Sequence, residues 1–103
     1  MPTYDILYTD SFIASLRAII SDWAEIGFDD DQIQSFIRIV YREIELLKTF
    51  PKRFQDVTDL YHFEQVTRRL LIGRYAVFYR VDDARKMIDI GSVFSSKQMD
   101  LRF

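Results

Sequence analysis

The spacing of the apolar residues changes once along this chain, at Pro51. Between residues 10 and 50, apolar side chains recur every three or four positions, which is the period of an amphipathic helix. From residue 66 onward, short stretches rich in β-branched and aromatic residues are separated by turn residues, which is the pattern of β-strands. We therefore expect helices in the first half of the chain and a sheet in the second, that is, an α+β fold.

Two helices are predicted before Pro51. The first starts at a cap provided by Asp10 or Ser11 and ends at Gly27, because glycine readily adopts the left-handed conformation that closes a helix. The second covers about 31–50, where Pro51 ends it, since proline has no backbone N–H to donate. A short turn joins the two helices, so we expect an antiparallel helical hairpin.

Four strands are predicted, one ahead of the helices and three after them, at residues 4–8, 66–72, 75–81 and 87–94. Tight turns suited to hairpins separate the last three, and residues 52–64 are expected to form a loop. The order β-α-α-β-β-β predicts a helical hairpin packed on one face of an antiparallel sheet. With 103 residues, the chain is expected to form one domain over 1–103.

The two faces of the middle strand differ in polarity. The more uniformly apolar face, expected to pack on the helices, carries Tyr75, Val77, Tyr79 and Val81. The opposite face of the sheet, which we expect to be open to solvent, carries Arg69, Ala76, Phe78 and Arg80.

The two halves of the chain also differ in charge. Residues 1–47 carry nine acidic and three basic side chains, whereas residues 48–103 carry eleven basic and seven acidic ones. The net charge of −2 and the pI near 5.3 argue against a protein that coats nucleic acid through bulk electrostatics. A basic surface on the second half can still meet an anionic target, and the alternative is a solvated mixture of charges.

Several kinds of functional site are disfavoured by the residues present. The sequence has no cysteine, which removes disulfide scaffolds, zinc fingers and cysteine nucleophiles. His62 is the only histidine and has no carboxylate pair at ligand spacing, so no metal site is expected. The three glycines are too widely separated for a phosphate-binding loop, and we expect no cofactor.

No membrane association is expected either. The longest stretch without a charged residue, 90–96, is far shorter than the ~18 residues of a membrane span. The first residues show neither a basic region nor an apolar signal segment, so we expect a cytoplasmic protein.

Arginine and aromatic side chains are the remaining candidates for function. Arg69, Arg74 and Arg80 lie on or beside two neighbouring predicted strands, and the last strand is followed by Lys97, Arg102 and Phe103. Guanidinium groups can stabilise developing phosphate charge, and aromatic rings can stack on a nucleobase. The alternative is that these arginines form a solvated face, with their apolar stems along the surface.

The segment 68–99 reads RRLLIGRYAVFYRVDDARKMIDIGSVFSSKQM, and it resembles the toxins of the RelE/ParE superfamily. These toxins belong to type II toxin–antitoxin and plasmid-stabilisation modules. The most specific part is GRYAVFYRVD at 73–82, which is similar to the family's G-x-Y-R-V-F-Y-R-V-D core. The opening strand, the helical pair and residues 50–57 extend the resemblance over nearly the whole chain. It implies the fold derived above.

The resemblance implies one of two growth-inhibiting activities. RelE-like members are ribosome-dependent, metal-independent mRNA endonucleases, and for that activity the expected catalytic residues are Arg69, Lys97 and Arg102. ParE-like members inhibit DNA gyrase by binding to it. The residues expected to bind nucleic acid or the target are Arg74, Arg80 and Phe103. A toxin whose activity has decayed is the third alternative.

This sequence departs from the RelE-like pattern at several positions. The arginine expected after the strand tyrosine is replaced by Ala76, and one of two basic strand positions falls on Thr67. Lys97 is the only base in the stretch that follows the last strand, and Phe103 can stack on a base but cannot transfer a proton. These departures and the acidic pI favour gyrase inhibition, and they leave open whether the protein is an enzyme.

The resemblance also implies a cognate antitoxin as partner, with DNA gyrase or the ribosome and its mRNA as cellular target. Phe12, Trp23 and Phe36 lie on helices of which one face must stay outside a two-layer core. We therefore expect an antitoxin segment to cover the helical pair and an exposed edge of the sheet.

Overall fold

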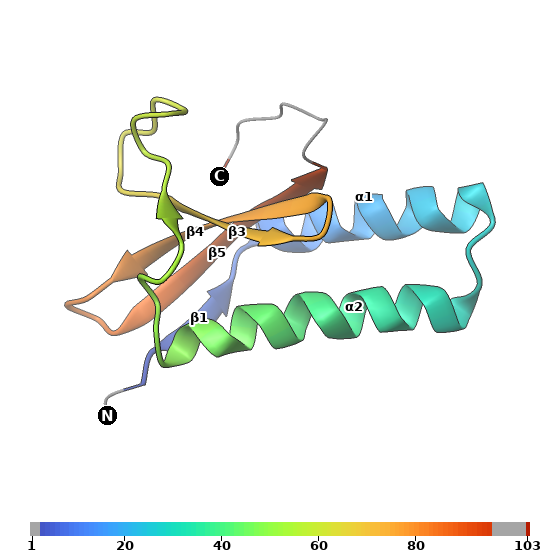
Figure 1. Ribbon diagram of the computed structural model, residues 1–103, viewed down its shortest axis with the longest axis horizontal. Coiled ribbons are helices and arrows are strands. Elements are labelled where there is room, and N and C mark those ends of the chain that lie inside the picture. Colours follow the sequence, from blue (N-terminus) through green and yellow to red (C-terminus); the bar gives the residue numbers. More distant parts are fainter. Residues whose placement is uncertain (1–2, 96–102) are drawn as a thin grey trace.

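The computed structural model describes residues 3–95 and residue 103 (Figure 1). Its elements, in chain order, are β1 (Asp5–Tyr8), α1 (Asp10–Ile26), α2 (Asp30–Glu45), the 3-10 turn η1 (Leu46–Lys48), β2 (Gln55–Asp56), β3 (Arg68–Ile72), β4 (Tyr75–Asp82) and β5 (Met87–Ser95). The predicted α+β class, the helical hairpin and the three long strands of the second half are confirmed.

The sheet has five strands in the order β1-β5-β4-β3-β2. β3, β4 and β5 form the predicted antiparallel meander, but β1 joins its edge parallel to β5, from Asp5 opposite Met87 to Tyr8 opposite Ile90. The sheet is therefore mixed, and the expectation of a purely antiparallel sheet is wrong. β2, which lies in the predicted loop 52–64, adds two residues to the start of β3. Strand pairing depends on distant partners, which local patterns do not reveal.

The helix ends differ slightly from the predictions. Thr9 caps α1, because its side-chain oxygen accepts a hydrogen bond from the backbone N–H of Phe12 at 3.2 Å. Gly27 closes α1 with a left-handed φ of 106°, as predicted. Asp29 caps α2 in a reciprocal pair of hydrogen bonds with Gln32. α2 ends at Glu45, before the predicted end, and η1 then brings a leucine side chain into the core.

The main core lies between the helices and the sheet. Its buried residues include Phe12, Leu16, Val40, Ile44, Leu47, Val77, Tyr79, Ile88 and Ile90. As predicted, the face of β4 that carries Val77 and Tyr79 packs on the helices. Phe12 and Phe36 lie on the inner faces of the helices: Phe12 is fully buried, and Phe36 is buried and stacks on Trp23 with ring centroids 4.6 Å apart.

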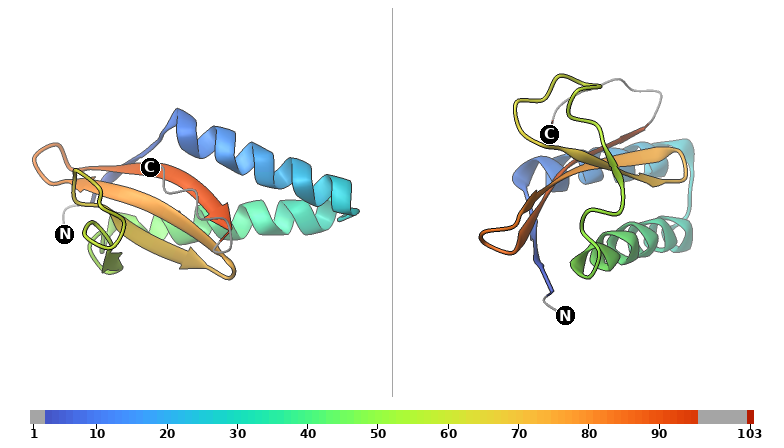
Figure 2. Two further views of the ribbon diagram at one scale, coloured as in Figure 1. Left: turned by 90° about the horizontal axis from the view of Figure 1, so that it is seen from above. Right: turned by 60° about the vertical axis from the view of Figure 1, so that its left-hand side comes forward.

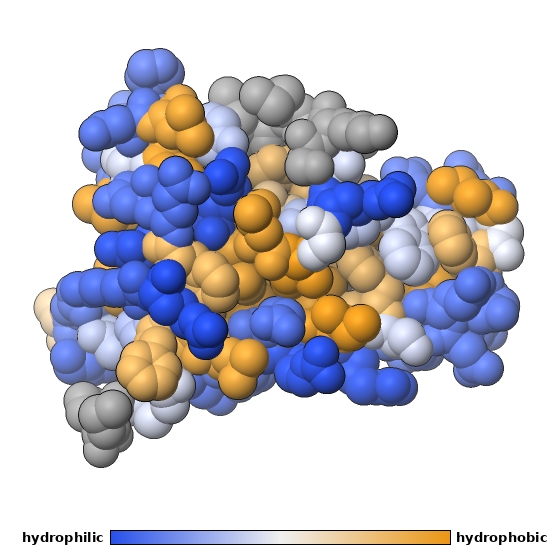
Figure 3. All heavy atoms as spheres, viewed as in Figure 1, coloured by the Kyte–Doolittle hydropathy of each residue, from blue (hydrophilic) through white to orange (hydrophobic). Residues whose placement is uncertain are grey.

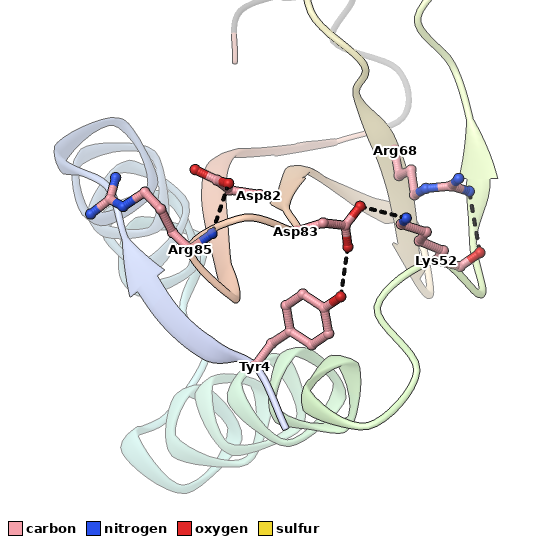
Figure 4. A network of polar contacts seen from close by, with 6 residues as sticks. All are labelled: Tyr4, Lys52, Arg68, Asp82, Asp83 and Arg85. Atoms are coloured by element: carbon pink, nitrogen blue, oxygen red, sulfur yellow. Dashed lines mark hydrogen bonds and ion pairs between the residues drawn. The ribbon is translucent and has the colours of Figure 1, made fainter. Parts of the chain in front are cut away.

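A polar network fastens three segments at the end of the molecule near β1 (Figure 4). Asp83, in the turn between β4 and β5, accepts hydrogen bonds of 2.6 Å from the Tyr4 hydroxyl and from Lys52 Nζ. The bond from Lys52, followed by that from Tyr4, lowers the pKa of the Asp83 carboxyl below its ordinary value. The network joins the start of β1 to the β4–β5 turn and to the segment after η1.

Candidate interaction site on the far face of the sheet

One face of the sheet is turned away from the helices, and we call it the far face. Its side chains, placed by the strand register, are those of Arg69, Leu71, Ala76, Phe78, Arg80 and Asp89. We expected this face to be open, and the structure shows that it is largely covered. The segment between β2 and β3 rises over it, and the right-hand view of Figure 2 shows this segment on the side of the sheet away from α2.

A second, smaller apolar cluster lies under this cover. Its buried members are Val57, Ala76, Phe78 and Phe94, with Tyr61, Phe63 and Phe103 packed against them. The Phe78 ring centroid lies 4.9 Å from that of Phe63 and 4.7 Å from that of Phe94. The face could not stay open because leaving two phenylalanine rings in water is unfavourable, and the segment after β2 supplies the rings that cover them.

Arg69, on β3, is held by this covering segment. Its Nη1 donates a 2.7 Å hydrogen bond to the Tyr61 hydroxyl and its Nη2 donates a 2.9 Å bond to Gln55 Oε1. The guanidinium also lies over the Tyr61 ring, 5.9 Å from its centroid. Its Nε is buried and has no hydrogen-bond partner. Arg69 therefore holds the cover onto the sheet, rather than presenting a free guanidinium to solvent.

Arg80, on β4, lies between two aromatic rings. Its guanidinium carbon is 3.8 Å from the ring centroid of Phe103 and 5.8 Å from that of Phe63. Its Nε donates a 3.0 Å hydrogen bond to Thr67 Oγ1. Burial lowers the pKa of the guanidinium from its ordinary value, and Asp89 on the neighbouring strand opposes this shift. The arrangement is that of a cation–π site, in which the charged guanidinium lies between two aromatic rings.

Two of the positions that depart from the RelE-like pattern, Thr67 and Ala76, have structural roles on this face. Thr67 is fully buried and accepts the hydrogen bond from Arg80, while its own hydroxyl donates to the Gln65 carbonyl oxygen at 2.9 Å. Ala76 is buried in the second cluster, where a long arginine side chain would displace the residues that cover it.

The structure brings together three of the predicted site residues, Arg69, Arg80 and Phe103, and separates a fourth from them. Arg74 is exposed in the turn between β3 and β4, six residues before Arg80, which places it about 20 Å away along the strand. Lys97 and Arg102 lie outside the described residues. Sequence analysis missed Tyr61 and Phe63; the signal that could have revealed them is a pair of aromatic residues, two positions apart, in an otherwise polar segment.

A second surface feature, which we call the hairpin groove, lies where the helical hairpin meets the β3–β4 turn. It has a volume of about 650 Å³, and its lining includes Trp23, Ile26, Phe28, Phe36, Ile39 and Arg74. Ile26 is 74% exposed and Ile39 is 41% exposed. Figure 3 shows apolar side chains gathered on this side of the molecule, between α2 and the β3–β4 turn.

Two findings bear on membranes and metals. Within residues 3–95, no helix is long and apolar enough to cross a bilayer. The same part of the chain contains no group of three histidine, aspartate or glutamate side chains that could hold a metal ion.

Comparison with known proteins gives the family. Residues 6–99 match the profile described as the ParE toxin of the type II toxin–antitoxin system, parDE. The chain belongs to the ParE toxin family. The match runs from β1 past the end of β5, so it includes all the helices and the long strands of this ParE-family toxin. The resemblance to the RelE/ParE superfamily is confirmed.

Solved structures confirm the fold of this ParE-family toxin. It is similar to a chain of the toxin–antitoxin complex RelBE2 from Mycobacterium tuberculosis, with a TM-score of 0.59 and 17% identity over 90% of this chain and 98% of that one. It is also similar to a chain of the archaeal RelE–RelB complex from Pyrococcus horikoshii OT3, with a TM-score of 0.52 and 19% identity over 90% of this chain and 94% of that one. The search of curated protein sequences found no significant match.

Proposed function

We propose that this ParE-family toxin arrests growth in the cytoplasm by binding to DNA gyrase, and that a cognate antitoxin holds it inactive. The observation that carries the proposal is the composition of the far face, together with the family. Arg69, Arg80, Tyr61, Phe63 and Phe103 gather there, and arginine and aromatic residues are the types that dominate the energetics of protein interfaces.

The same geometry supports binding more than cleavage of RNA. Arg69, the best candidate for stabilising a transition state, uses two of its donors within the protein. Arg80 is held between rings, and phenylalanine at 103 cannot act as a general acid or base. An interface needs shape and several anchors, whereas RNA cleavage needs a donor that is free to meet the developing charge.

The hairpin groove is the surface that we assign to the antitoxin. Its lining is apolar and open to solvent, and the acidic side chains of Asp22, Asp29 and Asp31 line it or the adjoining pocket, with Arg74 as a single base. An amphipathic helix with apolar residues on one face and lysine or arginine at its borders would complement this surface. One of the two similar structures is a toxin–antitoxin complex, and the other is a complex of RelE with RelB.

The deciding experiment is induction of the toxin alone, with DNA synthesis and protein synthesis followed separately. An early stop in replication, with gyrase-linked DNA breaks, and inhibition of gyrase supercoiling by the purified protein are expected. An early stop in translation, with mRNA cut at ribosomal A-sites, would overturn the proposal and establish an endonuclease. A chain that affects neither process would be a toxin with decayed activity.

The antitoxin part is tested by co-expression with the small open reading frame next to the gene. We expect rescue of growth and a co-purifying complex, and we expect Ile39→Glu to weaken that complex because it puts a charge into the apolar lining. Thr3→Glu, a change at an exposed position away from the groove, is the matched control. Toxicity that is unaffected by the neighbouring frame would count against this assignment.

A further inference from the structure

Gly91 on β5 is in direct contact with the Phe103 ring. A Cβ atom added at position 91 would lie 2.6 Å from Phe103 Cδ2, 2.8 Å from Cε2 and 2.9 Å from the backbone carbonyl carbon of the same residue, which is closer than real Cβ contacts come. The backbone of Gly91 does not have a positive φ, unlike that of Gly27 and Gly73. Glycine is therefore needed at this position because Phe103, with its ring and its backbone, occupies the space of a side chain, and not because of the conformation of β5.

The strand is shaped for this contact. Val77 pairs with Val93, but Tyr79 pairs with Ile90, so Gly91 and Ser92 both lie opposite Phe78 in a β-bulge. Gly91 follows Asp89 on the far face by two positions, which brings it next to the strand position of Arg80. The Phe103 ring packs against the backbone at Gly91, where no side chain intervenes, and also lies over the Arg80 guanidinium.

Three groups then restrain Arg80. Phe103 lies on its guanidinium at 3.8 Å, Phe63 lies at 5.8 Å, and Thr67 accepts the hydrogen bond from Nε. Because a long arginine side chain loses much rotamer freedom when it binds a partner, an arginine that is already held binds with a smaller entropic cost. Of the three restraints, the one from Phe103 depends on the missing side chain at position 91.

We propose that Gly91 is a positioning residue for target binding: it admits the Phe103 ring, and the ring holds Arg80 as a preformed anchor on the far face. This inference rests on the proposed function in one respect, namely that the far face meets the target. Gly91 itself touches no partner in this arrangement. Its effect on binding passes entirely through Phe103.

The proposal is tested with Gly91→Ala, Phe103→Ala and the double variant, by growth arrest on induction and by inhibition of gyrase supercoiling. Each single change is expected to weaken the effect about tenfold, the loss typical of one interface anchor. Because Gly91 acts only through Phe103, Gly91→Ala is expected to cause no further loss in the Phe103→Ala background. Additive losses would overturn the proposal, since Gly91 would then act on the strand itself.

A chemical measurement reports the position of Arg80 independently of activity. Phenylglyoxal modifies accessible arginines, and mass spectrometry can compare Arg80 with the exposed Arg85 of the same molecule as internal reference. We expect both single variants to raise the modification rate of Arg80 relative to Arg85. Unchanged relative rates would show that the ring does not shield Arg80 and would contradict the proposal, as would full toxicity in a variant with raised rates.

Two further arms separate other causes. If Gly91→Ala lowers the melting temperature strongly, Phe103→Leu is used in its place, because this change removes the aromatic ring and leaves β5 untouched. Retained toxicity of the Phe103→Leu variant would again refute the role of Arg80 as an anchor held by the ring. If the unmodified protein fails to inhibit gyrase, the proposed target is wrong. Growth arrest and Arg80 modification still decide the role of Gly91 in that case.

Discussion

Arg69 donates a 2.7 Å hydrogen bond to the hydroxyl of Tyr61, across the boundary between the sheet and the segment that covers its far face. With the second bond, to Gln55, this contact links β3 to both β2 and the covering segment. The guanidinium thus has a structural task on the same surface that we propose to meet the target.

Arg69→Ala is therefore expected to loosen the cover. Hydrogen bonds that involve a charged group contribute about 1.5–3 kcal/mol, so a loss in the free energy of unfolding of about that size is expected from urea denaturation. Faster amide hydrogen exchange is expected over residues 57–63. Tyr61→Phe, which removes only the hydroxyl, should show a smaller change in the same direction. An unchanged exchange pattern in both variants would mean that the cover is held by its rings alone.

Arg68, the preceding residue on β3, provides the contrast. It donates hydrogen bonds of 3.2 Å and 2.7 Å to the carbonyl oxygens of Lys52 and Phe54, away from the far face. Arg68→Ala is expected to lower stability, measured by thermal melting, and to leave growth arrest intact at temperatures where the protein is folded. Loss of toxicity in a folded Arg68 variant would show that the target-binding surface extends beyond the far face.

Trp23 and Tyr75 tie the helical hairpin to the sheet. Trp23 Nε1 donates a 2.8 Å hydrogen bond to the Tyr75 hydroxyl in a part-buried position. Trp23→Phe and Tyr75→Phe are each expected to cost about 0.5–1.5 kcal/mol of unfolding free energy from this bond, with a further packing loss for the smaller ring at position 23. Urea denaturation of both single variants and the double variant, followed by circular dichroism, gives a double-mutant cycle. If the two losses in unfolding free energy simply add in the double variant, the hydrogen bond contributes nothing.

Ile44 on α2 is completely buried in the main core, whereas Ile26 at the end of α1 is 74% exposed. Ile44→Ala is expected to destabilise the fold by about 2–5 kcal/mol, since it removes buried methylene groups and leaves a cavity. Ile26→Ala makes the same chemical change at the surface and is expected to alter stability by no more than about 0.5 kcal/mol. Chemical denaturation of the pair measures the contrast, and similar losses at both positions would contradict the assignment of the core.

Asp83 is expected to make stability depend on acid pH. Its pKa in the folded protein is lowered by Lys52 and Tyr4, so its charged form stabilises the fold above the pKa of an unfolded aspartate, about 3.9, and this contribution is lost as pH falls through the folded value. Asp83→Asn should therefore lower the melting temperature at pH 7 and have little effect near pH 2.

Lys52→Met is the companion variant, because it removes the main partner of the carboxylate and keeps much of the side-chain volume. It should show the same pH dependence, and the double variant should add little to either single change. A difference in melting temperature that is equal at pH 7 and pH 2 would show that the charge of Asp83 is not the cause.

The predictions that held depend on interactions within a few residues of one another. The left-handed cap at Gly27 and the division of β4 into two faces are local properties of the chain, and the family resemblance at residues 73–82 rests on a contiguous motif. Helix closure at a glycine and the alternation of side chains along a strand are both decided by residues that are adjacent in the sequence.

Tertiary structure alone decided what lies on the far face. Phe78 and Phe94 needed a cover, and only the folded chain brings Tyr61, Phe63 and Phe103 from two distant segments over them. The same holds for the parallel pairing of β1 with β5 and for the ring of Phe103 on Gly91. Such contacts join residues far apart in sequence, so they arise from the packing of the whole core and not from local pattern.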